Sequence, residues 1–122
     1  MTQRQKLEDY MKTIYRLSRK GSVRGVDISR SLNVSRPTVS VSLRQLEQEG
    51  YVELRDNRVT LTEKGLAIAE EISDRNTEIC RMLKELGVDE ATAEKDACNM
   101  EHAISRESFS ALLALADSRQ EA

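Results

Sequence analysis

Residues 23–54, VRGVDISRSLNVSRPTVSVSLRQLEQEGYVEL, decide the fold of this 122-residue chain. Apolar residues at helical spacing predict a short helix near residues 26–32. Ser35 is a typical N-cap and Pro37 is tolerated in a first helical turn, so a further helix begins here and ends at Gly50. Two helices joined by such a short turn are typical of a helix-turn-helix.

The sequence on either side of this stretch completes a winged helix. Residues 5–20 repeat apolar side chains at helical spacing, which predicts an opening helix. Residues 51–54 and 58–62 alternate apolar and polar side chains as strands do, and turn-forming residues separate them. Helix, helix-turn-helix and hairpin in this order predict a winged-helix domain in residues 1–62.

The second half of the chain, residues 63–122, predicts an all-helical domain. Thr62 is a candidate cap for a long helix, Asp89 for a fifth helix and Ser105 for a sixth. The last two helices are apolar enough on one face to supply a dimer interface. The expected fold class is therefore mainly α, with a winged helix-turn-helix domain followed by a helical dimerisation domain.

Contact with DNA is the function that a winged helix predicts, because the second helix of the motif lies in the major groove. Arg36 is the best candidate to read a base, since its guanidinium matches the acceptors of guanine. Arg24, Arg55 and Arg58 are candidates for phosphate or minor-groove contacts. The candidate contacts on the second helix of the motif are Ser35, Arg36, Pro37, Thr38 and Ser40.

Charge is distributed unevenly along the chain, although the net charge is only -2. Residues 1–61 carry 12 Lys or Arg and 7 Asp or Glu (+5), whereas residues 62–122 carry 7 and 14 (-7). A basic first half favours contact with a polyanion over a winged helix that makes only protein contacts. One winged helix gives weak specificity, so we expect a homodimer that reads two half-sites of a double-stranded operator.

The segment CNMEHAIS, residues 98–105, holds the only histidine in the chain and one of its two cysteines. On a helix, Cys98, Glu101 and His102 share one face. Thiolate, carboxylate and imidazole all bind divalent transition metals, and a fourth ligand must then come from elsewhere. The alternative is that Cys98 is a small core residue while Glu101 and His102 face solvent.

Composition restricts the remaining possibilities. No apolar run reaches membrane-spanning length and the polar amino terminus lacks a signal-peptide pattern, so we expect a soluble cytoplasmic protein with reduced thiols. The single histidine has no evident nucleophile partner, and no phosphate-cradling glycine loop is present. These features indicate neither an enzyme nor a small organic substrate.

Four segments together resemble the metal-dependent repressors of the diphtheria-toxin-repressor and manganese-transport-regulator type. They are LEDYMKTIYRL, residues 23–52, VTLTEKG and CNMEHAIS. The resemblance implies a winged-helix domain followed by a helical dimerisation and metal-binding domain, and it implies repression. The chain ends before the SH3-like domain of longer members would begin, so it looks like the short two-domain branch.

The resemblance also implies a metal-ligand set of Asp9, Cys98, Glu101 and His102. Asp9 matches the manganese branch and Cys98 the iron branch, so Fe²⁺ or Mn²⁺ is expected, with Zn²⁺ or Co²⁺ as further possibilities. An ion held in this way would tie the first helix to the fifth and favour the DNA-competent state.

Two positions depart from the family pattern. Lys12 stands where the manganese branch has a glutamate, and Asn76 stands where the family usually has a histidine. A protonated lysine cannot bind a metal, so we expect the second metal site to be absent and Lys12 to pair with Asp9 or Glu101. Cys80, near Asn76, is either a further candidate ligand or a packed core thiol. The alternative is a metal-independent winged-helix regulator whose metal site has degenerated.

Overall fold

The computed structural model describes residues 2–121, with side chains up to Arg119, and the chain divides into two units within α4, after Glu71. The elements of the first unit are α1 (Gln3–Ser18), β1 (Val23–Arg24), α2 (Gly25–Leu32), α3 (Arg36–Gln48), β2 (Val52–Arg55) and β3 (Arg58–Leu61). The helices that follow are α4 (Glu63–Glu85), α5 (Glu90–Ala103) and α6 (Arg106–Glu121). The mainly α fold class is confirmed, whereas the domain boundary between residues 62 and 63 stays a prediction.

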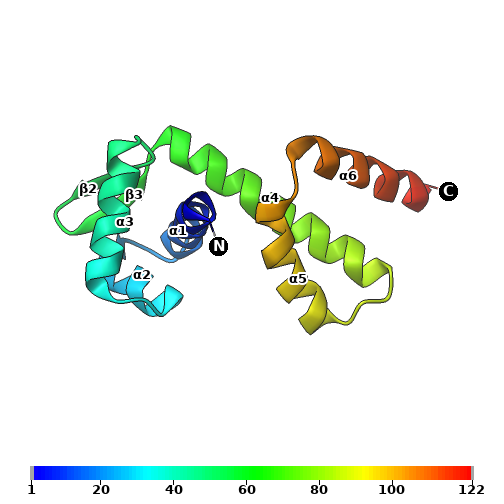
Figure 1. Cartoon of the computed structure of the whole chain (residues 1–122), viewed down its shortest axis with the longest axis horizontal. Helices are drawn as coiled ribbons and strands as arrows, with labels where there is room; N and C mark the ends of the chain where they lie inside the picture. The colour runs from blue at the N-terminus through cyan, green and yellow to red at the C-terminus, as the bar shows by residue number, and fades with distance from the viewer. Residues whose placement is uncertain (1, 122) are drawn as a thin grey trace. The chain divides into compact units, whose positions relative to one another are not determined.

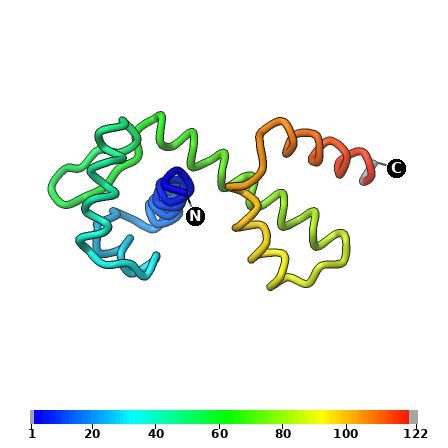
Figure 2. The backbone as a smooth tube through the Cα atoms, in the orientation of Figure 1, coloured from blue at the N-terminus to red at the C-terminus, as the bar shows by residue number. Residues whose placement is uncertain are grey.

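The turn between α2 and α3 is the helix-turn-helix that the sequence predicts (Figures 1 and 2). Asn33 ends α2 in the left-handed conformation, with φ 55°, which asparagine tolerates better than most residues. The backbone N–H of Val34 donates to the carbonyl of Ser29 at 3.1 Å. Ser35 then caps α3, since its Oγ accepts a hydrogen bond from the Thr38 N–H at 3.3 Å.

The sheet has three strands in the order β1-β3-β2, all antiparallel, so the predicted hairpin gains a third strand. Asp56 and Asn57 form its two-residue turn with φ of 52° and 62°, the positive values that a type I′ turn requires. The sequence does not predict β1, because two residues are too few to show alternation. Val23 pairs with Val59, and this pairing with β3 is what makes β1 a strand.

The core of the first unit lies between α1, α2, α3 and the inner face of the sheet. α1 packs against α2 and β3, and α3 packs against α2 and β2. Both strands of the hairpin point their alternate apolar residues inward, which fixes their register. The side chains of this core that have at most 2% of their surface exposed are Met11, Ile14, Val23, Ile28, Val39, Leu46, Val52 and Ala69.

In the second unit, one narrow stripe along α5 is buried. Ala93, Ala97 and Glu101 recur every four residues and are fully buried. Arg75 of α4 donates hydrogen bonds to the backbone carbonyls of Glu101 at 3.2 Å and Ile104 at 3.4 Å. α4 and the end of α5 are thus held together by a guanidinium as well as by buried apolar side chains.

The predicted caps of the last three helices are all confirmed. The hydroxyl of Thr62 accepts from Gly65 N–H at 3.1 Å, Asp89 Oδ2 accepts from Thr92 N–H at 3.1 Å, and Ser105 Oγ accepts from Ser108 N–H at 3.1 Å. None of the helices within the described residues is long and apolar enough to cross a membrane.

Candidate functional site

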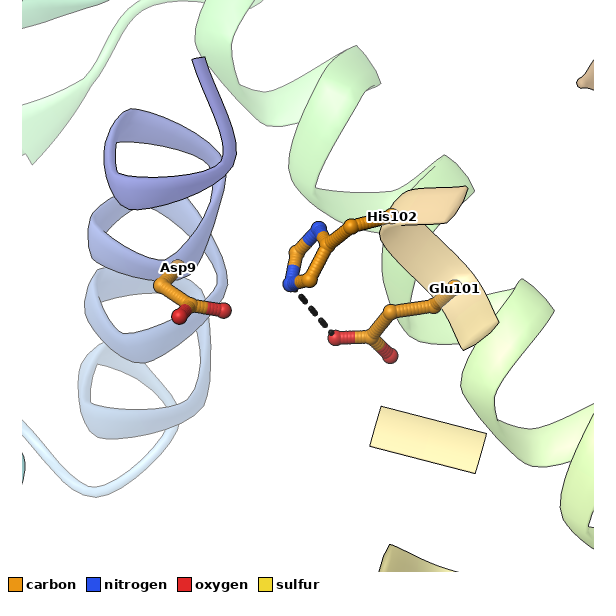
Figure 3. A group of neighbouring side chains, drawn as sticks. All are labelled: Asp9, Glu101 and His102. Atoms are coloured by element: carbon orange, nitrogen blue, oxygen red, sulfur yellow. Dashed lines mark ion pairs between the residues drawn. The ribbon is translucent and has the colours of Figure 1, made fainter. Parts of the chain in front are cut away.

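Glu101 and His102, near the carboxyl end of α5, form a close pair of ionisable side chains with almost no exposure to solvent. Glu101 is fully buried, and its Oε1 lies 3.3 Å from Nε2 of His102, whose side chain is only 4% exposed (Figure 3). Oε2 of Glu101 accepts no hydrogen bond within the described residues, although Glu101 has a further interaction besides the one with His102. A buried carboxylate is costly unless positive charge compensates it.

Cys98 lies one turn before Glu101 on the same helix but is exposed. Its Sγ accepts a hydrogen bond from the Asn76 amide at 3.2 Å, which links α5 to α4. The alternative in which Cys98 fills the core and Glu101 and His102 face solvent is therefore wrong. In the part of the chain described here, no close group of three ligand atoms includes the Cys98 sulfur.

Cys80 and Asn76 lie one turn apart on α4 and are both half-buried. Together with Glu94 and Cys98 they line a shallow depression of about 710 Å³. Within the described residues, Cys80 and Cys98 form no disulfide. Nothing in this arrangement tests whether Cys80 takes part in metal binding, so that assignment stays a prediction.

Asp9 and Lys12 occupy adjacent turns of α1 in the first unit, and both are half-buried with polar contacts of their own. Asp9, drawn in Figure 3 on α1, offers a carboxylate oxygen as a possible ligand atom, as Glu101 offers an oxygen and His102 a nitrogen. Carboxylate oxygen and imidazole nitrogen are ligands that manganese and iron(II) accept, so each of these side chains by itself can serve as a metal ligand. The pairing of Lys12 with Asp9 or Glu101 stays a prediction.

The predicted DNA contacts on α3 lie at its amino-terminal end. All five side chains are exposed: Ser35, Arg36, Pro37, Thr38 and Ser40. The Ser35 hydroxyl lies 2.8 Å from that of Thr38, and it also caps the helix. Arg36, Thr38 and Ser40 are therefore exposed on α3, whereas Ser35 is largely committed to the cap, and the contact of these residues with DNA stays a prediction.

The predicted contacts outside α3 converge on the same region of the first unit. A groove of about 560 Å³ lies between α3 and the β2–β3 hairpin and is lined by Arg24, Arg36, Arg55 and Arg58. The groove also includes Arg44, which the sequence did not single out. Arg44 lies two turns after Arg36 on α3, and only the position of the hairpin beside the helix identifies it.

Among the described residues of the second unit, the carboxylate of Asp89 and the guanidinium of Arg81 have shifted pKa values. Hydrogen bonds from the Thr92 hydroxyl and backbone N–H lower the pKa of Asp89, the cap of α5. Hydrogen bonds to Glu78 and Glu85 raise the pKa of Arg81, which also reaches Asp117 of α6 at 3.4 Å. Asp89 caps the start of α5, and Arg81 links α4 to α6.

The chain matches two family models that together cover most of its length. Residues 3–59 match the iron dependent repressor, N-terminal DNA binding domain, and residues 62–121 match the iron dependent repressor, metal binding and dimerisation domain. An uncharacterized HTH-type transcriptional regulator of Methanocaldococcus jannaschii is 36% identical over 107 residues, which are 84% of this chain and 86% of that protein.

Two further proteins show the same likeness. The transcriptional regulator MntR of Salmonella typhimurium is 36% identical over 113 residues, which are 91% of this chain and 72% of that protein. A solved structure of a manganese-dependent transcriptional repressor in complex with manganese is 28% identical, with a TM-score of 0.78. That alignment covers 93% of this chain and 51% of the repressor, so the chain spans about half of the repressor's length.

Proposed function

The chain belongs to the iron dependent repressor family, whose members are metal-dependent DNA-binding transcriptional regulators rather than enzymes, and from this premise we propose how its own residues act. We propose that Asp9, Cys98, Glu101 and His102 hold one divalent ion and that the chain, as a homodimer, then represses transcription at a two-half-site operator. This activity would take place in the cytoplasm.

The observation that carries the metal proposal is the burial of Glu101 beside His102. A fully buried carboxylate 3.3 Å from an imidazole is a site where positive charge is strongly favoured. A bound ion supplies that charge. Cys98 would join it by turning its side chain away from Asn76, and Asp9 would contribute from α1.

We propose that Fe²⁺ or Mn²⁺ is the physiological ion. Oxygen and nitrogen donors suit both, and a thiolate adds affinity for iron, cobalt or zinc. The family models name iron, and the similar solved repressor is described as manganese-dependent. A ligand from each domain would couple metal binding to DNA binding, typically by about 1–3 kcal/mol.

We propose that only one ion binds per subunit. Lys12 and Asn76 stand where the family resemblance places ligands of a second ion, and an ammonium group has no lone pair to donate. Calorimetric titration with Mn²⁺ should give one tight site per subunit. Two tight sites would contradict the proposal.

The homodimer would bring two α3 helices to one DNA duplex. An apolar depression of about 310 Å³ in the second unit is lined by Met82, Leu86, Leu112 and Leu115. Leu86 and Leu115 are at least 60% exposed, which is unusual for large apolar side chains that cluster. We propose that a second copy of the chain covers this surface.

Selection of DNA from a random duplex pool tests the proposed function directly. The purified chain is incubated with Mn²⁺, with Fe²⁺ under anaerobic conditions, or with chelator. We expect a two-half-site sequence to be enriched only when metal is present. Equal enrichment with chelator would support the metal-independent alternative instead.

A further inference from the structure

α5 ends directly after the two buried ionisable side chains that it carries. Glu101 and His102 occupy its last turn (Figure 3). Ala103 is its last residue, and Ile104 is extended, with φ -102° and ψ 139°. In a helix that continued, the N–H of Ser105 would donate to the carbonyl of Glu101. Because Ile104 turns the chain away and Ser105 caps α6, the carbonyls at the end of α5 need partners from another segment.

Arg75 of α4 supplies such partners. Its Nη1, which carries two hydrogens, donates to the carbonyl of Glu101 at 3.2 Å and to that of Ile104 at 3.4 Å. Arg75 is half-buried, and hydrogen bonds from a charged donor are stronger where water is partly excluded. A cation at the carboxyl end of a helix also interacts favourably with the helix dipole. Arg75 is therefore a carboxyl-terminal cap of α5, although it lies 26 positions before Glu101 in the sequence.

We propose that Arg75 is a positioning residue for metal binding, because by fixing the last turn of α5 it holds the side chains of Glu101 and His102 in place for a divalent ion. The inference rests on the proposed function, in which these two side chains are ligands. Donor atoms of a metal site lie within about 0.2 Å of their usual distances from the ion, whereas the ends of helices fray. Groups that orient ligands without touching the ion contribute about 10-fold to 100-fold in metal affinity.

Metal titration of Arg75→Gln tests this role. Glutamine is uncharged and shorter than arginine, so it does not reach both carbonyls of α5. The affinity of the full chain for Mn²⁺ is measured by calorimetry, at a temperature where circular dichroism shows the metal-free variant to be folded. We expect Arg75→Gln to lose about 10-fold to 100-fold in affinity. Arg75→Lys, which keeps the charge and has three N–H donors, should recover part of that loss.

The matched control is Arg81→Gln. Arg81 is also a half-buried arginine of α4 that reaches another helix, but its partner there is Asp117 of α6 at 3.4 Å. We expect Arg81→Gln to bind Mn²⁺ with the wild-type affinity even if its melting temperature falls. An equal loss of affinity in Arg81→Gln and Arg75→Gln would mean that the general stability of the second unit controls binding, and it would overturn the inference.

The electron paramagnetic resonance spectrum of bound Mn²⁺ reports the position of the ligands separately from affinity. Its line shape depends on the symmetry of the ligands around the ion, and a frayed last turn would supply those ligands in more than one arrangement. We expect a broader spectrum for metal-saturated Arg75→Gln than for wild type and Arg81→Gln. Wild-type affinity or a wild-type spectrum in Arg75→Gln would overturn the inference and leave the proposed function intact. Failure of the wild-type chain to bind Mn²⁺ would instead overturn the proposed function, and this inference with it.

Discussion

Glu101 and Cys98 occupy the reverse of the environments that their residue types favour, because the carboxylate is buried and the thiol is exposed. One helical turn separates them on α5, so the orientation of the helix about its own axis determines how far each of the two side chains is buried. The Ala93–Ala97 stripe is buried, and Glu101 continues that stripe. A residue pattern that looks like an ordinary polar helix end thus places an acid in the interior.

Replacing Glu101 with glutamine tests whether the buried charge serves metal binding. Glu101→Gln keeps the shape and removes the charge, which no longer has to be compensated in the interior. We expect the metal-free variant to melt at or above the wild-type temperature, and Mn²⁺ to raise its melting temperature far less than it raises that of wild type. The control is Glu94→Gln, an exposed position on the same helix, which should respond to Mn²⁺ as wild type does.

Replacing Cys98 with alanine tests the sulfur ligand. A thiolate contributes most to binding of soft ions, so affinity for Zn²⁺ or Co²⁺ should fall more than affinity for Mn²⁺. Competition against a coloured chelator measures both affinities, and Cys80→Ala tests separately whether the second thiol contributes. Wild-type affinities for both ions in Cys98→Ala would remove Cys98 from the ligand set.

At the scale of single elements, the start of α4 is fixed to the connection between α3 and β2. The Thr62 hydroxyl donates to the Gly50 carbonyl at 2.6 Å, and Thr62 N–H donates to the Tyr51 carbonyl at 3.0 Å. Lys64 donates to the Glu49 carbonyl at 2.9 Å and lies over the Tyr51 ring. The first turn of α4 therefore docks tightly against backbone.

Gly65 is buried at this junction, and a Cβ there would lie 2.1 Å from the Tyr51 carbonyl oxygen. Backbone must shift to relieve such an overlap, so we expect Gly65→Ala to lower the free energy of unfolding by about 1–3 kcal/mol. At Gly25 the same change meets nothing closer than Val39 at 3.8 Å. Gly25→Ala should therefore alter the free energy of unfolding by less than about 1 kcal/mol, as urea denaturation would show.

The cap of α5 predicts a specific acid sensitivity. Asp89 has a pKa below its ordinary value because its charged form accepts hydrogen bonds from Thr92. A lowered folded pKa stabilises the fold fully above the unfolded pKa, and the stabilisation is lost as pH falls through the folded pKa. We expect the melting temperature of wild type to fall more steeply below about pH 4 than that of Asp89→Asn, which keeps a capping oxygen without titrating. Equal slopes would contradict this assignment.

At the scale of the whole molecule, function is expected to depend on pairing of two chains. The proposed dimer surface around Leu112 and Leu115 exposes apolar side chains that a charge would disrupt. We expect Leu115→Asp to halve the mass seen in analytical ultracentrifugation and to abolish enrichment of two-half-site DNA. Leu66→Asp, at an exposed leucine near the start of α4, should leave the dimer intact.

The sequence by itself determined the helix-turn-helix, the hairpin and the amino-terminal caps of α3, α4, α5 and α6, because these depend on neighbours a few residues apart. Ser35, Thr62, Asp89 and Ser105 each cap the helix that follows, as their local spacing predicts. The apolar alternation of the hairpin likewise fixes which side chains point inward.

Only the tertiary structure decided the features that join segments distant in sequence. β1 is a strand because β3 lies beside it, and Arg44 belongs to the basic groove because the hairpin folds against α3. Glu101 is buried and Cys98 exposed because packing selects one face of α5, and helical spacing alone cannot say which face that is. Local hydrogen bonds and hydrophobic periodicity depend on residues close together in the sequence, whereas the burial of one helix face and the pairing of distant strands depend on the element that each packs against.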